Sequence, residues 1–162
     1  NVFGSRGSVV PLFLKQKEEG LITVTDKKMT RFTLILDEAV NFVLNCAVNM
    51  IGGEIFVPKL PSYSICQLAN IIAPGVEQKE VGIRPGEKLH ESMLGDYESY
   101  LAIDATDKYI ITPIVYVCKP QKFTNKYGSN FCESQFVYSS GNNYLISNER
   151  LSKMVEQFKK EN

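Results

Sequence analysis

The sequence has only one histidine, no tryptophan and no excess of charge of either sign. Lys plus Arg and Asp plus Glu both number 18, so the formal net charge is zero. A neutral chain has no broad cationic field with which to hold nucleic acid or an anionic membrane surface. We therefore expect neither as a partner, and we expect any bound phosphate to be met by a few individual residues.

Long apolar runs and metal-binding motifs are also missing. The longest apolar runs are a few residues, well short of the roughly 20 that a membrane-spanning helix needs. The cysteines Cys46, Cys66, Cys118 and Cys132 form no C-x-x-C pair and lie at no zinc-ligand spacing from His90. We expect no metal site, reduced thiols in a cytoplasmic protein, and an exposed or capping role for the lone His90 rather than a catalytic one.

What is present favours a folded α/β chain. Hydrophobic residues make up 44% and charged residues 22% of the sequence, as in ordinary globular proteins. Apolar periodicity, Pro and Gly predict helices from about 9 to Gly20, around 40–48 with a stop at Gly52, from Ser64 to Pro74, at 87–94, and from Ser147 onward. Strands are predicted at 21–25, 54–58 and 79–83, with a hairpin of 97–102 and 108–112, whereas 113–146 is interpreted as mostly loop with one or two short strands.

One chemical motif of dinucleotide enzymes is absent. A complete dinucleotide-binding domain has a glycine-rich turn after its first strand, because only glycine lets the backbone approach a pyrophosphate closely. No such turn occurs here, and the chain begins at Asn1. We interpret the sequence as part of a longer protein whose opening βαβ unit lies elsewhere.

Three segments have the composition of a binding site, and their order suggests a family. They are 1–11 (NVFGSRGSVVP), 29–39 (MTRFTLILDEA) and 82–91 (GIRPGEKLHE). In this order and spacing they resemble the distal half of the inverting UDP-N-acetylglucosamine 4,6-dehydratases, extended short-chain dehydrogenase/reductases that open the pseudaminic-acid route of bacterial surface and flagellin glycosylation. The resemblance is close over 1–112 and looser over 136–155.

The resemblance implies a fold and a division of labour along the chain. The fold would be α/β, the C-terminal part of an extended short-chain dehydrogenase/reductase with a Rossmann-like sheet and a smaller mixed α/β substrate-binding domain. Residues 1–20 would end the NADP-binding domain, 21–112 would bind the UDP-sugar, and 113–162 would be a C-terminal extension with a terminal helix.

Arginine and a carboxylate are suited to a nucleoside diphosphate, because a guanidinium fork matches phosphate oxygens and a carboxylate accepts from ribose hydroxyls. By resemblance, Arg84 would contact the diphosphate and Glu87 the ribose, and we expect both to converge with Arg31. The implied substrate-binding set is Asn1, Val24, Thr30, Arg31, Arg84 and Glu87. The implied cofactor-binding set is Val2, Phe3, Gly4, Ser5 and Arg6, with NADP bound mainly by the missing half.

The resemblance also implies a reaction for the intact protein. Sugar C4 gives hydride to NADP, water is lost across C5 and C6, and hydride returns to C6 with inversion at C5. Enzymes of this superfamily use a Tyr with a Lys four residues later as acid/base, and none of the eight tyrosines has one. We therefore assign no catalytic residue to this chain, expect it to be inactive alone, and expect the intact protein to form a homo-oligomer.

Other functions remain open at the level of sequence. A retaining UDP-sugar dehydratase or a UDP-sugar 4-epimerase shares the R-P-G-E-K-L motif at 84–89, and a non-catalytic nucleotide-binding module would use the same residues. Alternatively, 82–91 is a surface turn and Arg31 a solvated charge. If the main sheet is missing, the apolar faces of 9–14 and 40–48 should be exposed.

Overall fold

The computed structural model describes residues 2–5, 7–114 and 121–161, which fall into two compact units. Unit 1 is built from Asn1–Ala39, Leu60–Glu91 and Ser140–Asn162, and unit 2 from Val40–Lys59 and Ser92–Ser139. The units therefore interleave along the chain. The functional division into 1–20, 21–112 and 113–162 stays a prediction.

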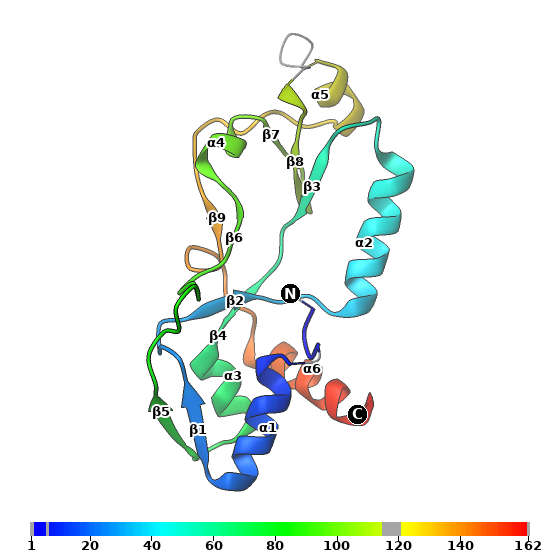
Figure 1. The fold of residues 1–162 in the computed structure, drawn as a ribbon. Coiled ribbons are helices and arrows are strands. Elements are labelled where there is room, and N and C mark those ends of the chain that lie inside the picture. Colours follow the sequence, from blue (N-terminus) through cyan, green and yellow to red (C-terminus); the bar gives the residue numbers. More distant parts are fainter. Residues whose placement is uncertain (1, 6, 115–120, 162) are drawn as a thin grey trace. The chain divides into compact units, whose positions relative to one another are not determined.

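Unit 1 contains three helices and two small sheets among its described residues. Strand β1 (Leu21–Val24) pairs in parallel with β5 (Glu77–Glu80), and β2 (Thr30–Phe32) pairs antiparallel with β4 (Ser62–Ser64). Helices α1 (Val9–Glu19), α3 (Ile65–Ile72) and α6 (Asn148–Glu161) gather beside these strands (Figure 1). The buried core comes from all three helices and from β1, and includes Val10, Phe13, Ile22, Val24, Leu68, Ile72, Leu151 and Val155.

Unit 2 is built around a three-stranded antiparallel sheet. Its strand order is β3 (Ile55–Pro58), β8 (Lys108–Ile111), β7 (Ala102–Asp104). A second antiparallel pair joins β6 (Ser92–Leu94) to β9 (Tyr138–Ser139), and two short helices, α4 (Asp96–Ser99) and α5 (Gln121–Tyr127), complete the unit. Ile103, Ile110 and Phe123 form its buried centre.

Helix α2 (Leu36–Asn49) runs from unit 1 into unit 2, and none of its residues is buried. Its apolar side chains Val43 and Val48 are 63% and 80% exposed, as expected for the face of 40–48. The same expectation is wrong for 9–14, because Val10 and Phe13 lie in the core of unit 1.

Several predicted helix ends are confirmed in detail. Helix α1 ends at Gly20, whose φ of 77° lies in the left-handed region that glycine adopts without strain. Ser64 caps α3 by accepting from the Gln67 backbone N–H at 3.0 Å. The reciprocal half of a capping box is missing, because the Gln67 side chain bonds Ile146 and Asn148 instead.

The predicted helix at 87–94 is wrong, and the reason is tertiary pairing. The Leu89 carbonyl accepts from the Thr30 N–H, and the Glu91 carbonyl accepts from the Ser140 N–H. These bonds use backbone groups that a helix would pair internally. Residues 92–94 consequently form strand β6.

Other boundaries also differ from the prediction. Residues 96–99 form helix α4, so the first hairpin strand is only Ala102–Asp104. The strand predicted at 79–83 is Glu77–Glu80, and helix α5 lies in the segment interpreted as loop.

The structural findings on membrane spans, metal sites and thiols apply to the described residues only. No helix there is long and apolar enough to cross a membrane. No group of three or more His, Cys, Asp or Glu there could hold a metal ion. Cys46, Cys66 and Cys132 have free thiols, and Cys118 lies outside the described residues.

Glu54 in unit 2 should make stability depend on pH. Burial raises the pKa of its carboxyl, but hydrogen bonds from Tyr127 and from the backbone N–H groups of Ile51 and Gly52 outweigh this and lower the pKa below that of an ordinary glutamate. The stabilisation that the ionised Glu54 carboxylate gives to the folded state is therefore fully present above the unfolded-state pKa. It is lost as the pH falls through the folded-state pKa. Glu54→Gln should lower the unfolding free energy by about 1 kcal/mol at pH 7 and by less near pH 3. Urea unfolding across this pH range measures it.

The exposed Glu133 of the same unit provides a matched control. Glu133→Gln should leave the unfolding free energy unchanged within error. An equal loss in both variants, or a Glu54→Gln loss that does not vary with pH, would contradict the assignment.

Candidate functional site

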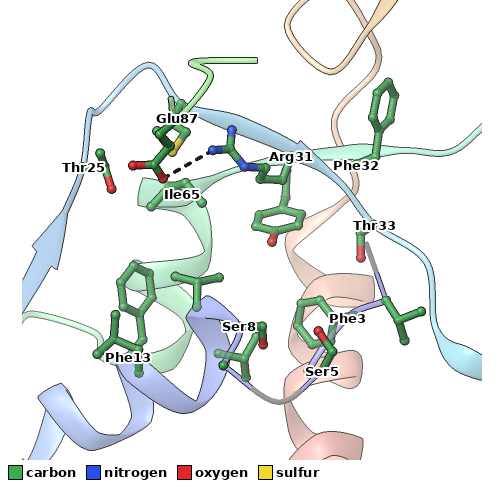
Figure 2. Close-up of a pocket in the computed structure, with 18 of the residues that line it drawn as sticks. Phe3, Ser5, Ser8, Phe13, Thr25, Arg31, Phe32, Thr33, Ile65 and Glu87 are labelled. Carbon is green, nitrogen blue, oxygen red and sulfur yellow. Dashed lines mark ion pairs between the residues drawn. The ribbon is translucent and has the colours of Figure 1, made fainter. Parts of the chain in front are cut away.

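Unit 1 contains a cavity of about 380 Å³. Its walls come from the loop before α1, the start of α1, the ends of β1 and β2, β4, and the segment after β5 (Figure 2). The lining residues that matter below are Val2, Phe3, Gly4, Ser5, Ser8, Arg31, Thr33, Tyr63, Arg84 and Glu87. Charged, hydroxyl-bearing and aromatic side chains therefore meet in one hollow.

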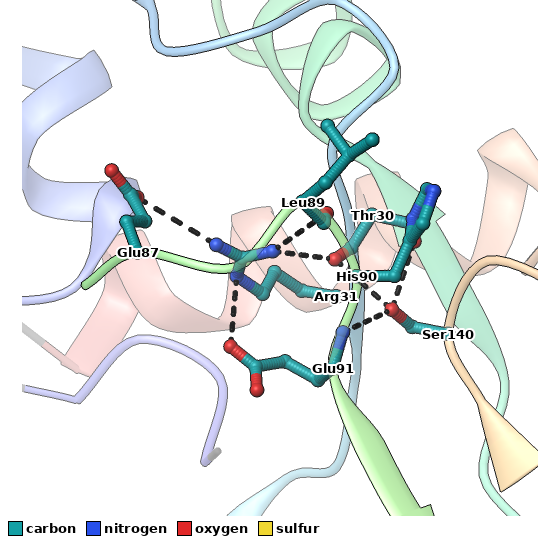
Figure 3. Close-up of polar contacts among 7 residues, drawn as sticks. All are labelled: Thr30, Arg31, Glu87, Leu89, His90, Glu91 and Ser140. Atoms are coloured by element: carbon teal, nitrogen blue, oxygen red, sulfur yellow. Dashed lines mark hydrogen bonds and ion pairs between the residues drawn. The ribbon is translucent and has the colours of Figure 1, made fainter. Parts of the chain in front are cut away.

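Arg31 is the most constrained charged side chain of this cavity. It lies on β2 opposite Tyr63 of β4, and its side chain is only 13% exposed. Its Nη1 atom donates to the Thr30 carbonyl at 2.8 Å and to the Leu89 carbonyl at 3.1 Å (Figure 3). These two bonds fix the plane of the guanidinium group.

The rest of the Arg31 guanidinium is paired by charge but not by short hydrogen bonds. Nη2 lies 3.6 Å from Glu87 and Nε lies 3.7 Å from Glu91. A guanidinium has five N–H donors, and in the described part of the chain no acceptor lies within hydrogen-bond distance of the three on Nη2 and Nε. Arg31 is therefore held in place with donors still available to an anion.

Arg84 and Glu87 are brought together by a tight turn. Pro85 and Gly86 occupy its central positions, Gly86 has φ of 82°, and the Glu87 N–H donates to the Arg84 carbonyl at 3.0 Å. Proline followed by a glycine of positive φ is the pattern of a type II turn. The Arg84 residue is exposed, whereas the Glu87 carboxylate faces Arg31 across the cavity (Figure 2).

A network of polar side chains anchors this segment behind Arg31. His90 Nδ1 and Thr30 Oγ1 are 2.7 Å apart, and Thr30 Oγ1 and Ser140 Oγ are 2.8 Å apart. Ser140 Oγ accepts from the Glu91 N–H at 3.0 Å (Figure 3). The exposed or capping role expected for His90 is wrong, because its ring is half-buried and bonded to β2.

Tyr63 contributes a neutral hydroxyl to the cavity. Burial raises the pKa of its phenol to about 12, although the positive charge of Arg31 acts in the opposite direction. Its ring packs edge-on against Phe3 with the centroids 6.2 Å apart. The phenol therefore stays protonated at neutral pH.

The expected convergence of Arg31, Arg84 and Glu87 is confirmed, since all three line the same cavity. Of the residues expected to contact the cofactor, Val2, Phe3, Gly4 and Ser5 also line it. Gly4 has φ of 74° and lies against Phe158, where a β-carbon would be 2.3 Å from the ring. The ligand roles of these residues stay predictions.

Val24 and Thr30 lie beside the cavity rather than on its wall. The Val24 carbonyl accepts from the Val81 N–H at 2.9 Å, and the Thr30 hydroxyl bonds His90 and Ser140. Asn1 and Arg6 lie outside the described residues. Sequence reasoning missed Ser8, Thr33 and Tyr63, although the spacing of two residues between Arg31 and Thr33 places them on one face of an extended strand.

Comparisons with known proteins give one consistent result. The model of a family described as "Polysaccharide biosynthesis protein" matches residues 1–113. A UDP-N-acetylglucosamine 4,6-dehydratase (inverting) of Campylobacter jejuni is 45% identical over 93% of this chain and 47% of its own length. A UDP-glucose 4-epimerase of Rickettsia conorii is 39% identical over 68% of this chain and 34% of its own length. The chain thus spans about half the length, or less, of these curated relatives.

A solved structure gives the same result for the fold. The X-ray structure of Pen from Bacillus thuringiensis superposes with a TM-score of 0.78 at 32% identity, over 97% of this chain and 46% of that one. The expected α/β fold, the C-terminal part of an extended short-chain dehydrogenase/reductase, is confirmed.

Ser140→Ala tests whether the polar network of Thr30, His90 and Ser140 stabilises the site. The change removes the acceptor of the Glu91 N–H and a partner of Thr30, so it leaves polar groups in a largely buried place unpaired. The unfolding free energy should fall by about 1–3 kcal/mol, measured by urea denaturation. Ser152→Ala on α6 is the control and should cost nothing, because alanine favours helices. Equal stability of both variants would show that the network is not structural.

Proposed function

Because this chain belongs to the family of polysaccharide biosynthesis proteins, we propose that its cavity binds a UDP-sugar, and specifically UDP-N-acetylglucosamine. The protein that contains it would then be an NADP-dependent, C5-inverting 4,6-dehydratase, producing a 4-keto-6-deoxy sugar nucleotide for surface or flagellin glycans. The observation on which this rests is that Arg31, Arg84 and Glu87 line one cavity.

The charges of the cavity suit a nucleoside diphosphate. Among the described lining residues, two arginines face one carboxylate, in a chain whose formal net charge is zero. Arg31 offers the donors on Nη2 and Nε, and Arg84 adds a second, exposed arginine to the lining of the same cavity. A diphosphate would accept from both, because charge-assisted bonds between Arg and phosphate are among the strongest in proteins.

Glu87 supplies the complementary acceptor. Its carboxylate is 30% exposed and lies 3.6 Å from Arg31 without a direct hydrogen bond to it. A carboxylate accepts from the two hydroxyls of a ribose, and its position in the turn after Arg84 would place the ribose next to the diphosphate. The three residues thus include a partner for the diphosphate and a partner for the ribose of UDP.

NADP would contact this chain at the loop Val2–Ser5. Those residues line the cavity, and glycine at position 4 lets the loop pack closely against Phe158 of α6. The cofactor, when bound, would accept and return the hydride. The larger part of its site would lie outside this chain.

A second candidate function is UDP-sugar 4-epimerization. Two relatives from Rickettsia that are named UDP-glucose 4-epimerase are 39% identical to this chain, over 68% of its length. The dehydratase of Campylobacter jejuni matches 93% of the chain. The dehydratase assignment is therefore preferred. A cytoplasmic location and homo-oligomer formation by the intact protein are proposed on the same family grounds.

Arg84→Ala should weaken UDP binding. The side chain lines the cavity and is exposed, so its removal should leave the fold intact. Loss of one charge-assisted contact to phosphate corresponds to about 10- to 100-fold in Kd. Isothermal titration of the intact protein with UDP measures the change, and titration with uridine should show almost none.

Arg150→Ala is the matched control, because Arg150 is exposed on α6 and is paired with Glu38 away from the cavity. It should bind UDP as the unchanged chain does. The proposal fails if UDP does not bind, or if both arginine variants bind it equally well.

The stereochemical outcome distinguishes the two candidate reactions. The intact protein incubated with UDP-N-acetylglucosamine should give a 4-keto-6-deoxy product inverted at C5, followed by proton NMR. A product retained at C5, or a C4 epimer that keeps its 6-hydroxyl group, would overturn the dehydratase assignment in favour of a retaining dehydratase or an epimerase.

A further inference from the structure

Two hydroxyl groups of the cavity have no hydrogen-bond partner within the described part of the chain. They are Ser8 Oγ and Thr33 Oγ1. Both residues line the cavity, and Thr33 is only 2% exposed. Buried hydroxyls almost always find a partner, because an unmade bond costs free energy. These two atoms therefore indicate an absent hydrogen-bonding group.

Local structure explains why neither hydroxyl is used by the fold. Ser8 occupies the N-cap position of α1, yet its side chain makes no capping bond. The Thr33 backbone N–H donates to the Pro61 carbonyl at 3.0 Å, so the backbone of Thr33 is satisfied while its hydroxyl is not. A serine that does not cap and a buried threonine that bonds nothing are both unusual.

The hydroxyls lie away from the charged part of the cavity. Figure 2 shows Glu87 and Thr25 to the left of Arg31 and Thr33 to its right, with Ser8, Phe3 and Ser5 below it. Ligands of the two ends should therefore differ. The end with Arg31 and Glu87 suits a charged group, and the hydroxyl end suits a neutral polar one.

We propose that Ser8 and Thr33 form a neutral subsite that hydrogen-bonds the hexose of the bound nucleotide-sugar. This inference rests on the proposed function and adds the residues that would recognise the sugar. The hydroxyl groups of serine and threonine can both donate and accept a hydrogen bond, as sugar hydroxyls can. Each residue can therefore bond a sugar hydroxyl as donor or as acceptor.

Thr33→Val and Ser8→Ala test the subsite by comparing two ligands. Each variant should bind UDP within about 2-fold of the unchanged chain, whereas UDP-N-acetylglucosamine should bind about 2- to 10-fold more weakly, the value of a neutral hydrogen bond. Thr33→Ser keeps the hydroxyl and should retain most of the sugar-dependent affinity. Isothermal titration with both ligands gives the ratio of the Kd for UDP-N-acetylglucosamine to the Kd for UDP in each variant.

Thermal unfolding gives an independent readout. Thr33→Val replaces an unpaired buried hydroxyl by a methyl group, so the Tm of the free chain should be unchanged or higher. A hydroxyl with a structural role would instead give a lower Tm on removal, and that result would overturn the proposal.

The outcomes separate the two levels of inference. If the intact, unsubstituted protein does not bind UDP, the proposed function itself fails. If UDP binds but both ligands weaken in parallel in the variants, the hydroxyls hold the diphosphate and the sugar subsite is wrong. If neither ligand is affected, the hydroxyls serve no ligand and the proposal is overturned.

Discussion

The two backbone carbonyls of Thr30 and Leu89 hold the Arg31 guanidinium, and the candidate site depends on this contact. Nη1 donates both bonds. The other two guanidinium nitrogens lie near carboxylates, Nη2 at 3.6 Å from Glu87 and Nε at 3.7 Å from Glu91. A cation 13% exposed would be costly without such partners. Carboxylates that are near but not hydrogen-bonded leave the donors on Nη2 and Nε available to a ligand.

The Leu89 carbonyl also accepts from the Thr30 N–H, so one atom joins the segment after β5 to strand β2. Ser140 reinforces the same junction from a third part of the chain, by bonding both the Thr30 hydroxyl and the Glu91 N–H. Arg31 comes from β2, while Glu87 comes from the segment that is pinned to it. The distance between cation and carboxylate is thus set by backbone pairing rather than by flexible side chains.

The sequence was informative where the chemistry is local. Proline followed by glycine is a local signal of a turn, and Pro85 and Gly86 occupy the centre of the turn that presents Arg84 and Glu87. The resemblance of three separated segments correctly predicted that their charged residues meet. Periodicity also placed the last helix, whose Leu151 and Val155 are buried.

The rest depended on partners far away in the chain. The helix predicted at 87–94 was excluded by bonds to residues about 50 to 60 positions away, which no local pattern contains. For the same reason His90 could not be connected with Thr30, or Ser140 with Glu91. That Ser8 and Thr33 lack partners is a property of the folded cavity, since both residue types usually find one.

A crystal structure of the chain with UDP tests the central claim most directly. The account predicts diphosphate oxygens within hydrogen-bond distance of Arg84 and of Nη2 or Nε of Arg31, with the ribose hydroxyls on Glu87. UDP bound elsewhere, with Arg31 still paired only to Glu87 and Glu91, would contradict it.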